Sequence, residues 1–305
     1  MNGIINVLKP SGMSSHDVVA YIRKTIGIKK VGHSGTLDPS AVGVLPVFIG
    51  KATKAVSYAI EETKSYRTEM KLGVITDTGD KDGKEIAVDD WKKYINEEEY
   101  YSNIDSILKS FKGKYAQIPP MYSAIKVNGQ KLYNMARQGK EIDRPPREVE
   151  INRIEIISCD YNEGLILFDV DCSKGTYIRV LCEDIGKKIG CGAHMSYLIR
   201  TQSSKFNIKN SYTLEEIKTA YEKNLLSEII MPVSELFNIY EKQVITDKNS
   251  LAKLMNGCYI EIKEIGINNT GNEVVALYSE HEFIGLADIF KENDKTYLKV
   301  KKFFV

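Results

Sequence analysis

The chain has 305 residues, of which 43% are hydrophobic and 27% charged, values that are typical of a globular protein and argue against a disordered chain. This length is enough for two domains. The net charge of +1 argues against a uniformly basic nucleic-acid binder. No apolar run approaches the ~20 residues of a membrane helix, and the N-terminus lacks the pattern of a secretory signal. The five cysteines form no CxxC pair, which predicts reduced thiols, a cytoplasmic protein and no zinc cluster.

The first predicted element is a helix over residues 14–27. Ser14 can cap its N-terminus, and Asp17 stands three residues later, as in a capping box. Apolar residues recur at helical spacing after this cap. Gly27 then supplies a typical helix end.

A Gly-rich loop over residues 32–50 follows and leads into an apolar run. Pro39 keeps Asp38 out of the helical region of backbone space, and Gly35 and Gly43 allow the backbone to turn tightly around it. A carboxylate on such a stiff loop is positioned rather than merely solvated. An Asp that only forms a turn is common, however, and the local pattern leaves both interpretations open.

The sequence of this loop partly resembles the phosphate-binding loop of nucleotide triphosphatases but does not match it. Six residues rather than four separate Gly43 from Gly50, and Ala52 stands where a phosphate-binding loop needs a hydroxyl group. The pattern therefore argues against a nucleotide triphosphatase. The four histidines are far apart, and no HExxH or CxxC spacing supports a metal site.

Residues 64–90 alternate as two strands around a polar turn. One face of the first strand carries Tyr66, Thr68, Met70 and Leu72. The turn resembles a calcium loop at Asp80, but Thr78 stands at the first ligand position and Asp89 at the position of the bidentate Glu. We therefore expect a hairpin turn rather than a metal site.

A helix-rich stretch over residues 91–113 precedes a long irregular segment with one short helical piece, residues 131–139. Residues 112–147 hold eight basic and two acidic residues, whereas residues 75–105 hold ten acidic and four basic residues. Because the basic segment also contains tyrosines, it is suited to follow phosphates and to stack on bases. A solvated surface with scattered aromatic residues has the same composition, so this alternative stays open.

The remaining elements combine strands and helices. Residues 163–175 are predicted as a strand and residues 175–190 as a helix with one apolar face. Thr213 with Glu216 caps a further helix. Residues 239–305, with one short helix and several strands, predict a small β-rich domain. The mixture of helices and long strands indicates the α+β class.

Five sequence blocks stand out along the chain. In chain order they are INVLKPSGMSS, GHSGTLDPSAVGVLPVFIGKATK, SYRTEMKLGVITDTGDKDG, PPMYSAIKVNGQKLYNMARQG and CSKGTYIRVLCEDIGKKIGCGAHMSYLIRT. The second block, residues 32–54, resembles the signature of the TruB family of tRNA pseudouridine synthases, and the other blocks resemble those of the same family in the same order. These blocks cover Ile4 to about Thr201. Val42 is one small departure, because many members of the family carry Thr at this position.

The resemblance implies the pseudouridine synthase fold, which has a mixed, largely antiparallel sheet, helices and a central cleft. It places this fold in a catalytic domain over residues 1–238. Residues 239–305 resemble the small PUA-like RNA-binding modules that are attached to this family. The implied reaction detaches a uracil from its ribose, turns it and rejoins it through carbon 5. Because this reaction has no redox step and adds no external group, no cofactor and no metal are expected.

The resemblance also implies which residues are catalytic. Asp38 is the implied catalytic carboxylate, acting on either the base or the sugar, and Arg179 is the neighbouring cation that keeps it ionised. Tyr66 is implied to stack on the target base and to help remove the proton from carbon 5. A phenol with an ordinary pKa near ~10 is a weak base at neutral pH, so positioning must supply much of this effect.

The implied substrate is uridine 55 in the T-loop of tRNA, which must leave its stack to reach Asp38. Tyr177 and Leu198 match residues that line the uracil pocket, and His33 matches a residue at the edge of the flipped nucleotide. We expect residues 112–147 to form a flap that closes over the T-arm. Four basic residues of this flap are expected to bind the RNA: Lys126, Lys131, Arg137 and Arg144.

We expect a monomer that acts on tRNA without a guide RNA. The guide-RNA-dependent pseudouridine synthases of archaea and eukaryotes share a GTLDP type of motif, but this chain lacks their long flanking extensions. A non-catalytic RNA-binding protein on the same scaffold is a second alternative, which the intact Asp38, Tyr66 and Arg179 argue against. A structural protein that uses the flap to bind other proteins has no support in the sequence.

Overall fold

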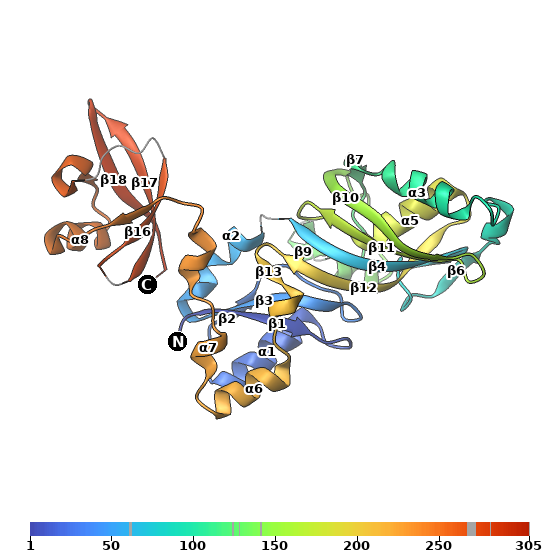
Figure 1. Cartoon of the computed structure of the whole chain (residues 1–305), viewed down its shortest axis with the longest axis horizontal. Helices are drawn as coiled ribbons and strands as arrows, with labels where there is room; N and C mark the ends of the chain where they lie inside the picture. The colour runs from blue at the N-terminus through green and yellow to red at the C-terminus, as the bar shows by residue number, and fades with distance from the viewer. Residues whose placement is uncertain are drawn as a thin grey trace.

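The computed structural model describes residues 1–60, 63–123, 125–127, 129–140, 142–266, 273–280 and 282–304. A large sheet runs through the body of the molecule, and a smaller sheet forms the C-terminal part (Figure 1). No helix within the described ranges is long and apolar enough to cross a membrane.

The large sheet has the strand order β1-β3-β12-β4-β11-β10-β7, with β2 paired to β3 and β13 paired to β12. β12 runs parallel to β3, and the other neighbours along this path are antiparallel. The sheet is therefore mixed and largely antiparallel, as predicted. Its strands are β1 (Gly3–Lys9), β2 (Val31–His33), β3 (Val42–Ile49), β4 (Lys64–Leu72), β7 (Gly113–Gln117), β10 (Arg147–Asp160), β11 (Leu165–Cys172), β12 (Ala193–Ser203) and β13 (Phe206–Asn207).

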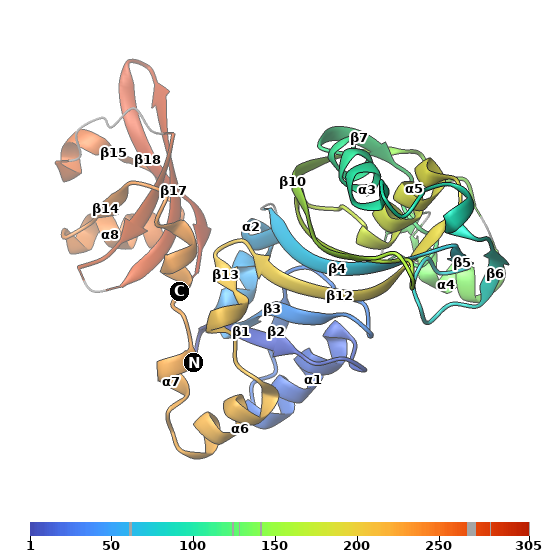
Figure 2. The ribbon, with the colours of Figure 1, turned by 45° about the vertical axis from the view of Figure 1, so that its right-hand side comes forward.

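The sheet curves around α3 (Tyr100–Lys109) and α5 (Ile178–Ile189) (Figure 2). Both helices pack against the end of the sheet that is formed by β4, β11, β10 and β7. The alternation along β4 explains this arrangement, because every second residue of that strand is buried. Its buried face packs in one core with the apolar faces of both helices. The prediction of a shared face that includes Tyr66 is thus confirmed.

The other end of the sheet is covered by α1 (Ser15–Ile26) and α6 (Leu214–Glu222). Both predicted capping boxes are present, from Ser14 in α1 and from Thr213 in α6. Gly27 ends α1 in the left-handed conformation, with φ of 70°. Caps of this kind satisfy backbone groups that a helix end leaves unpaired.

Two segments are inserted between strands of the large sheet, one after β4 and one between β7 and β10. β5 (Val74–Thr76) and β6 (Glu85–Val88) pair as a hairpin, which confirms the turn predicted between them. The basic segment contains β8 (Lys126–Val127), β9 (Gln130–Lys131) and α4 (Leu132–Arg137). Of the segment predicted as a flap, residues 112–147, the part Gly113–Gln117 pairs with β10 inside the large sheet. We therefore use "flap" below for residues 118–146.

The C-terminal sheet has the order β14-β16-β17-β18-β15 and its own apolar core. It also contacts the body, because Phe304 stacks on Phe237 and lies edge-on to Tyr58. Its elements are β14 (Lys242–Val244), α8 (Lys248–Met255), β15 (Ile260–Glu261), β16 (Val274–Tyr278), β17 (Phe283–Glu292) and β18 (Lys295–Phe303). Shorter helical elements are η1 (Gly50–Ala55), α2 (Val56–Ile60), η2 (Trp91–Lys93), η3 (Ile208–Asn210), α7 (Leu226–Ile229), η4 (Val233–Phe237) and η5 (Ile262–Ile265).

Candidate active site

The loop between β2 and β3 carries Asp38 and leads into β3, which lies between β1 and β12 in the large sheet. Gly35 and Gly43 flank it with φ of 85° and 112°, in the left-handed region that the sequence predicted glycine would allow. Gly43 is required for a second reason as well. A Cβ at that position would lie 2.2 Å from the backbone oxygen of Arg200 on β12.

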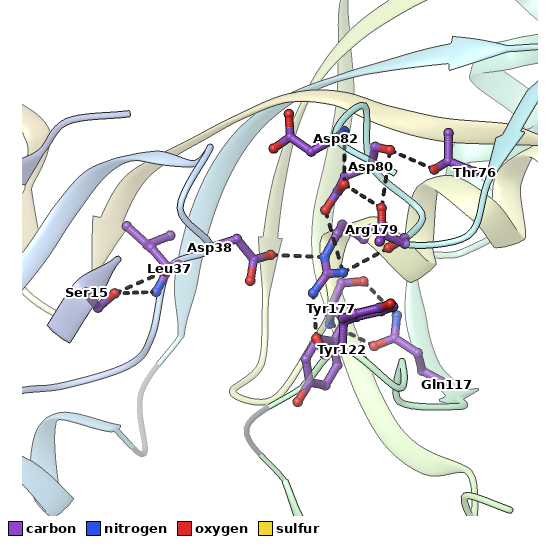
Figure 3. Close-up of polar contacts among 11 residues, drawn as sticks. Ser15, Leu37, Asp38, Thr76, Asp80, Asp82, Gln117, Tyr122, Tyr177 and Arg179 are labelled. Carbon is purple, nitrogen blue, oxygen red and sulfur yellow. Dashed lines mark hydrogen bonds and ion pairs between the residues drawn. The ribbon is translucent and has the colours of Figure 1, made fainter. Parts of the chain in front are cut away.

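Two buried side chains, those of Ser15 and Lys9, bind the backbone of this loop. The Ser15 Oγ accepts a hydrogen bond from the Leu37 backbone N at 2.8 Å and donates to the Leu37 O at 3.1 Å (Figure 3). The Lys9 Nζ donates to the carbonyl oxygens of Pro39 at 3.1 Å and Ala41 at 2.7 Å. Because the backbone is bound on both sides of Asp38, this carboxylate is positioned rather than free to move with the loop.

Arg179, at the start of α5, forms an ion pair with Asp38 as predicted. Its Nε lies 3.0 Å from the Asp38 Oδ2 (Figure 3). The Arg179 side chain is only 6% exposed, whereas that of Asp38 is 38% exposed. The guanidinium also donates to the carbonyl oxygens of Thr78 and Tyr122, both at 2.9 Å. Arg179 thereby joins the loop of Asp38, the β5–β6 insertion and the flap at one point.

Asp80 is a member of this cluster that the sequence analysis missed. Its Oδ2 lies 3.6 Å from the Arg179 Nη1, and its side chain is 11% exposed. Its Oδ1 accepts hydrogen bonds from the Thr78 hydroxyl at 2.6 Å and from the Asp82 backbone N at 3.2 Å. The signal in the sequence was present, because Asp80 was considered as a calcium ligand. It instead faces a buried arginine.

Tyr66 lies on the buried face of β4. It shares a core with Leu37 and with Leu198, the predicted pocket residue on β12. Burial raises the pKa of the Tyr66 phenol to about 12, the Arg200 side chain opposes this rise, and Asp38 adds to it. The structure therefore brings Tyr66, Leu198 and the loop of Asp38 together.

Tyr177 occupies the N-cap position of α5, two residues before Arg179, and is half-buried. The side chain of Gln117 holds its backbone through two hydrogen bonds (Figure 3). Gln117 Oε1 accepts from the Tyr177 N at 2.8 Å, and Gln117 Nε2 donates to the Tyr177 O at 3.1 Å. Because Gln117 is buried at the end of β7, it fixes the start of the helix that supplies Arg179.

His33 lies on β2 at the edge of this group, with its ring edge-on to His16 and the ring centroids 5.3 Å apart. Burial, followed by the charges of His16 and Arg200, lowers the pKa of His33 to about 4. His33 is therefore neutral at physiological pH. A neutral His33 fits the expectation that it does not serve as an acid, and its support of the substrate loop stays a prediction.

The lowered pKa of His33 predicts a loss of stability in acid. Between pH 6.5 and about 4 the unfolded chain binds a proton at this position and the folded chain does not. The free energy of unfolding should therefore fall as the pH falls through this range. Urea unfolding at several pH values should show a smaller fall for His33→Gln than for the original chain. An identical fall in both proteins would contradict this assignment.

The predicted RNA-binding residues of the flap are less completely described. The side chains of Lys126, Lys131 and Arg137 lie outside the described residues. Arg144 is half-buried and lines a cleft of about 270 Å³ that it shares with Tyr122 and with Glu183 on α5. The flap thus faces the body beside Arg179, and the role of its cations in RNA binding stays a prediction.

Comparison with known proteins extends over nearly the whole chain. A family model described as the N-terminal domain of the TruB family pseudouridylate synthase matches residues 23–178. A second model, the C-terminal domain of tRNA pseudouridylate synthase B, matches residues 179–238. The tRNA pseudouridine synthase B of Clostridium tetani is 45% identical over 97% of this chain and 98% of its own. That of Bacillus subtilis is 41% identical over 92% of this chain and 90% of its own.

Solved structures with the same fold cover 99% of this chain and 85% of their own chains. One is a Cbf5-Nop10-Gar1 complex, with a TM-score of 0.72 and 29% sequence identity. Another is an H/ACA RNP bound to a substrate RNA that contains 2'-deoxyuridine, with a TM-score of 0.70 and 26% identity.

Proposed function

The chain belongs to the TruB family of tRNA pseudouridine synthases, and we propose that it isomerises uridine 55 of the tRNA T-loop to pseudouridine, with Asp38 as the catalytic carboxylate. The observation that carries this proposal is the ion pair between Asp38 and the buried Arg179 at 3.0 Å. In this pair the carboxylate is the partner that reaches solvent, and the neighbouring Leu37 packs in one core with the buried Tyr66.

The reaction breaks the bond between the ribose C1′ and the uracil N1 and forms a bond between C1′ and C5. The proton on C5 leaves to solvent, and N1 ends with a proton. A carboxylate contributes as a nucleophile only if it is ionised and held in place. Arg179 supplies the opposite charge, and the hydrogen bonds of Lys9 and Ser15 supply the position. Attack on the base and attack on the sugar both fit this arrangement.

Tyr66 is placed to stack on the flipped uracil and to orient its C5. Its pKa of about 12 makes the phenolate scarce at neutral pH. We therefore expect Tyr66 to act mainly through its position, with proton removal as the smaller part of its effect. Tyr177 and Leu198 form the remaining walls of the proposed uracil pocket, and His33 supports the edge where the nucleotide leaves the tRNA.

Modification without a guide RNA is part of the proposal. The relatives that share 41–46% identity are named tRNA pseudouridine synthase B, whereas the structures of Cbf5 and H/ACA complexes share 26–29%. The chain also spans only 85% of the chains in those structures. We therefore expect a monomeric, cytoplasmic enzyme that binds the T-arm of tRNA directly.

The test is to incubate the purified protein alone with a tRNA transcript tritiated at C5 of uridine and to count tritium released to water. The proposal predicts release that is stoichiometric with the tRNA. Binding of tRNA without any release would support the non-catalytic alternative. Release that begins only after a guide RNA is added would support the guide-dependent alternative.

The proposed RNA contacts of the flap predict a salt-dependent affinity. The logarithm of the tRNA affinity should fall with the logarithm of the salt concentration, by about 0.7 to 0.9 for each phosphate contact. Replacing Lys126, Lys131 and Arg137 together with Gln should make this slope smaller. The matched control replaces three exposed lysines outside the flap with Gln: Lys24, Lys218 and Lys223. Equal slopes for the flap variant and the control would remove these residues from the RNA interface.

We also propose that residues 1–238 act as the catalytic domain and residues 239–305 as a PUA-like domain that binds tRNA away from the chemistry. The separate sheet and core of the C-terminal part support this division. The aromatic contact of Phe304 with Phe237 and Tyr58 would hold the two parts in one orientation on the RNA.

A further inference from the structure

Arg200 is the largest side chain that is completely buried among the described residues. It lies on β12, and within the part of the chain that the structure describes it forms no ion pair with a carboxylate. Burying a guanidinium costs free energy unless hydrogen bonds replace those it made to water. The groups that supply these hydrogen bonds therefore indicate why the cation is placed there.

Arg200 lies against three separate parts of the proposed active site. Its Nε donates to the carbonyl oxygen of Val44 on β3 at 2.7 Å. Its Nη2 donates to the carbonyl oxygen of Gly35 at 3.1 Å, three residues before Asp38. It is also the cross-strand partner of Tyr66 on β4, and its charge opposes the rise in the pKa of the buried Tyr66 phenol. One residue thus links the strand after the catalytic loop, the loop itself and the strand that carries the tyrosine.

The strands on either side of Arg200 place its backbone next to two parts of the proposed active site. Arg200 is the cross-strand partner of Tyr66 on one side and of Gly43 on the other. A Cβ on Gly43 would lie 2.2 Å from the Arg200 O, and a Cβ on Gly35 would lie 3.4 Å from the Arg200 Nη1. Gly43 therefore allows β3 to lie close to the backbone of Arg200, and Gly35 lies against the end of its guanidinium.

We propose that Arg200 is a positioning residue for the reaction, which holds the Tyr66 hydroxyl in a set place relative to the loop that carries Asp38. The inference rests on the proposed function, in which Tyr66 and Asp38 act on the same uracil. A guanidinium presents several N–H donors in one rigid plane, so it can serve three acceptors in different directions. A lysine keeps the charge but loses this planar arrangement.

The first test is Arg200→Lys. Because a misplacement of about 1 Å at a reacting group can cost about 10²-fold in rate, we expect kcat to fall by about 10- to 100-fold with KM for tRNA little changed. The matched control is Arg67→Lys. Arg67 lies next to Tyr66 on β4 but is bound to Asp169 on the other face of the sheet. A fall in kcat equal to that of the control, or a rise in KM with kcat unchanged, would overturn the inference.

A double-mutant cycle with Tyr66→Phe separates positioning from general damage to the fold. If Arg200 acts through the Tyr66 hydroxyl, Arg200→Lys should reduce kcat far less in the Tyr66→Phe background than in the original chain. If the fall in kcat of the double variant equals the product of the falls in the two single variants, Arg200 acts independently of the hydroxyl and the inference is wrong.

Thermal unfolding covers the case in which Arg200→Lys does not fold. If the Tyr66 hydroxyl accepts from the buried Arg200, as the inference requires, Tyr66→Phe should lower the melting temperature, because an unpaired buried donor is costly. A melting temperature that is unchanged or raised would overturn the inference. This readout needs no catalysis, so a chain that failed to release tritium would contradict the proposed function without deciding the role of Arg200.

Discussion

Asp38→Asn should abolish pseudouridine formation, with a loss of at least about 10⁴-fold in kcat, while tRNA is still bound. Removal of a nucleophile costs this much or more in enzymes that use one. Asn has nearly the same shape and keeps an oxygen that can accept from Arg179, but it carries no charge and is not a nucleophile. The loop should persist, because Lys9 and Ser15 bind its backbone rather than the side chain of Asp38.

The matched control for this prediction is Asp82→Asn. Asp82 is exposed, and it binds Asp80 through its backbone N rather than through its carboxylate. Single-turnover assays with excess enzyme should detect pseudouridine with the control and the original chain but not with Asp38→Asn. Equal modification by Asp38→Asn and Asp82→Asn would remove Asp38 from the mechanism.

Arg179→Met should impair both the chemistry and the fold. Its removal leaves Asp80, which is 11% exposed, as a buried carboxylate without its cation, and breaking a buried pair in this way costs about 3–5 kcal/mol. It also removes the group that neutralises Asp38, and loss of one preorganised donor lowers kcat on the order of 10²–10³-fold. Urea unfolding and tritium release measure the two effects separately.

Comparison of the free energies of unfolding of Arg179→Met and Arg67→Met shows whether burial of the ion pair causes the loss of stability. Arg67 binds Asp169 at 2.7 Å, but its side chain is 43% exposed. Exposed pairs contribute about 0–1 kcal/mol. If the two variants lose the same stability, the buried position of Arg179 has no special importance. Arg179→Lys should fold better than Arg179→Met yet remain slow, because one ammonium cannot contact the Asp38 carboxylate and two carbonyl oxygens in the same geometry.

The elements with strong local signals were predicted well. α1 and α6 follow from their capping boxes and helical periodicity, and β4 follows from its strict alternation. The loop of Asp38 was recognisable from Pro39 and two glycines, and its pairing with Arg179 followed from the family resemblance. For the helices, β4 and the loop itself, the information lies within a few consecutive residues, whereas the pairing of Asp38 with Arg179 needed the resemblance.

Other features depend on residues that are distant in the sequence and were missed. β10 has register shifts after Ile151 and Ile156, which break the period of two that identifies a strand. β12 also has two register shifts, and its pairing with both β3 and β4 was not recognisable from its own composition. The buried cations Lys9 and Arg200 bind carbonyl oxygens rather than carboxylates, so no charge pattern in the sequence indicated them.

The site of Asp38, Arg179 and Tyr66 is proposed to convert uridine 55 without a guide RNA. The decisive measurement is to treat a tRNA transcript with the purified protein alone and to locate pseudouridine by carbodiimide modification and primer extension. We expect one primer-extension stop, caused by pseudouridine at position 55, which is absent after treatment with Asp38→Asn. Pseudouridine at a different position, or none until a guide RNA is added, would rule out the proposed function.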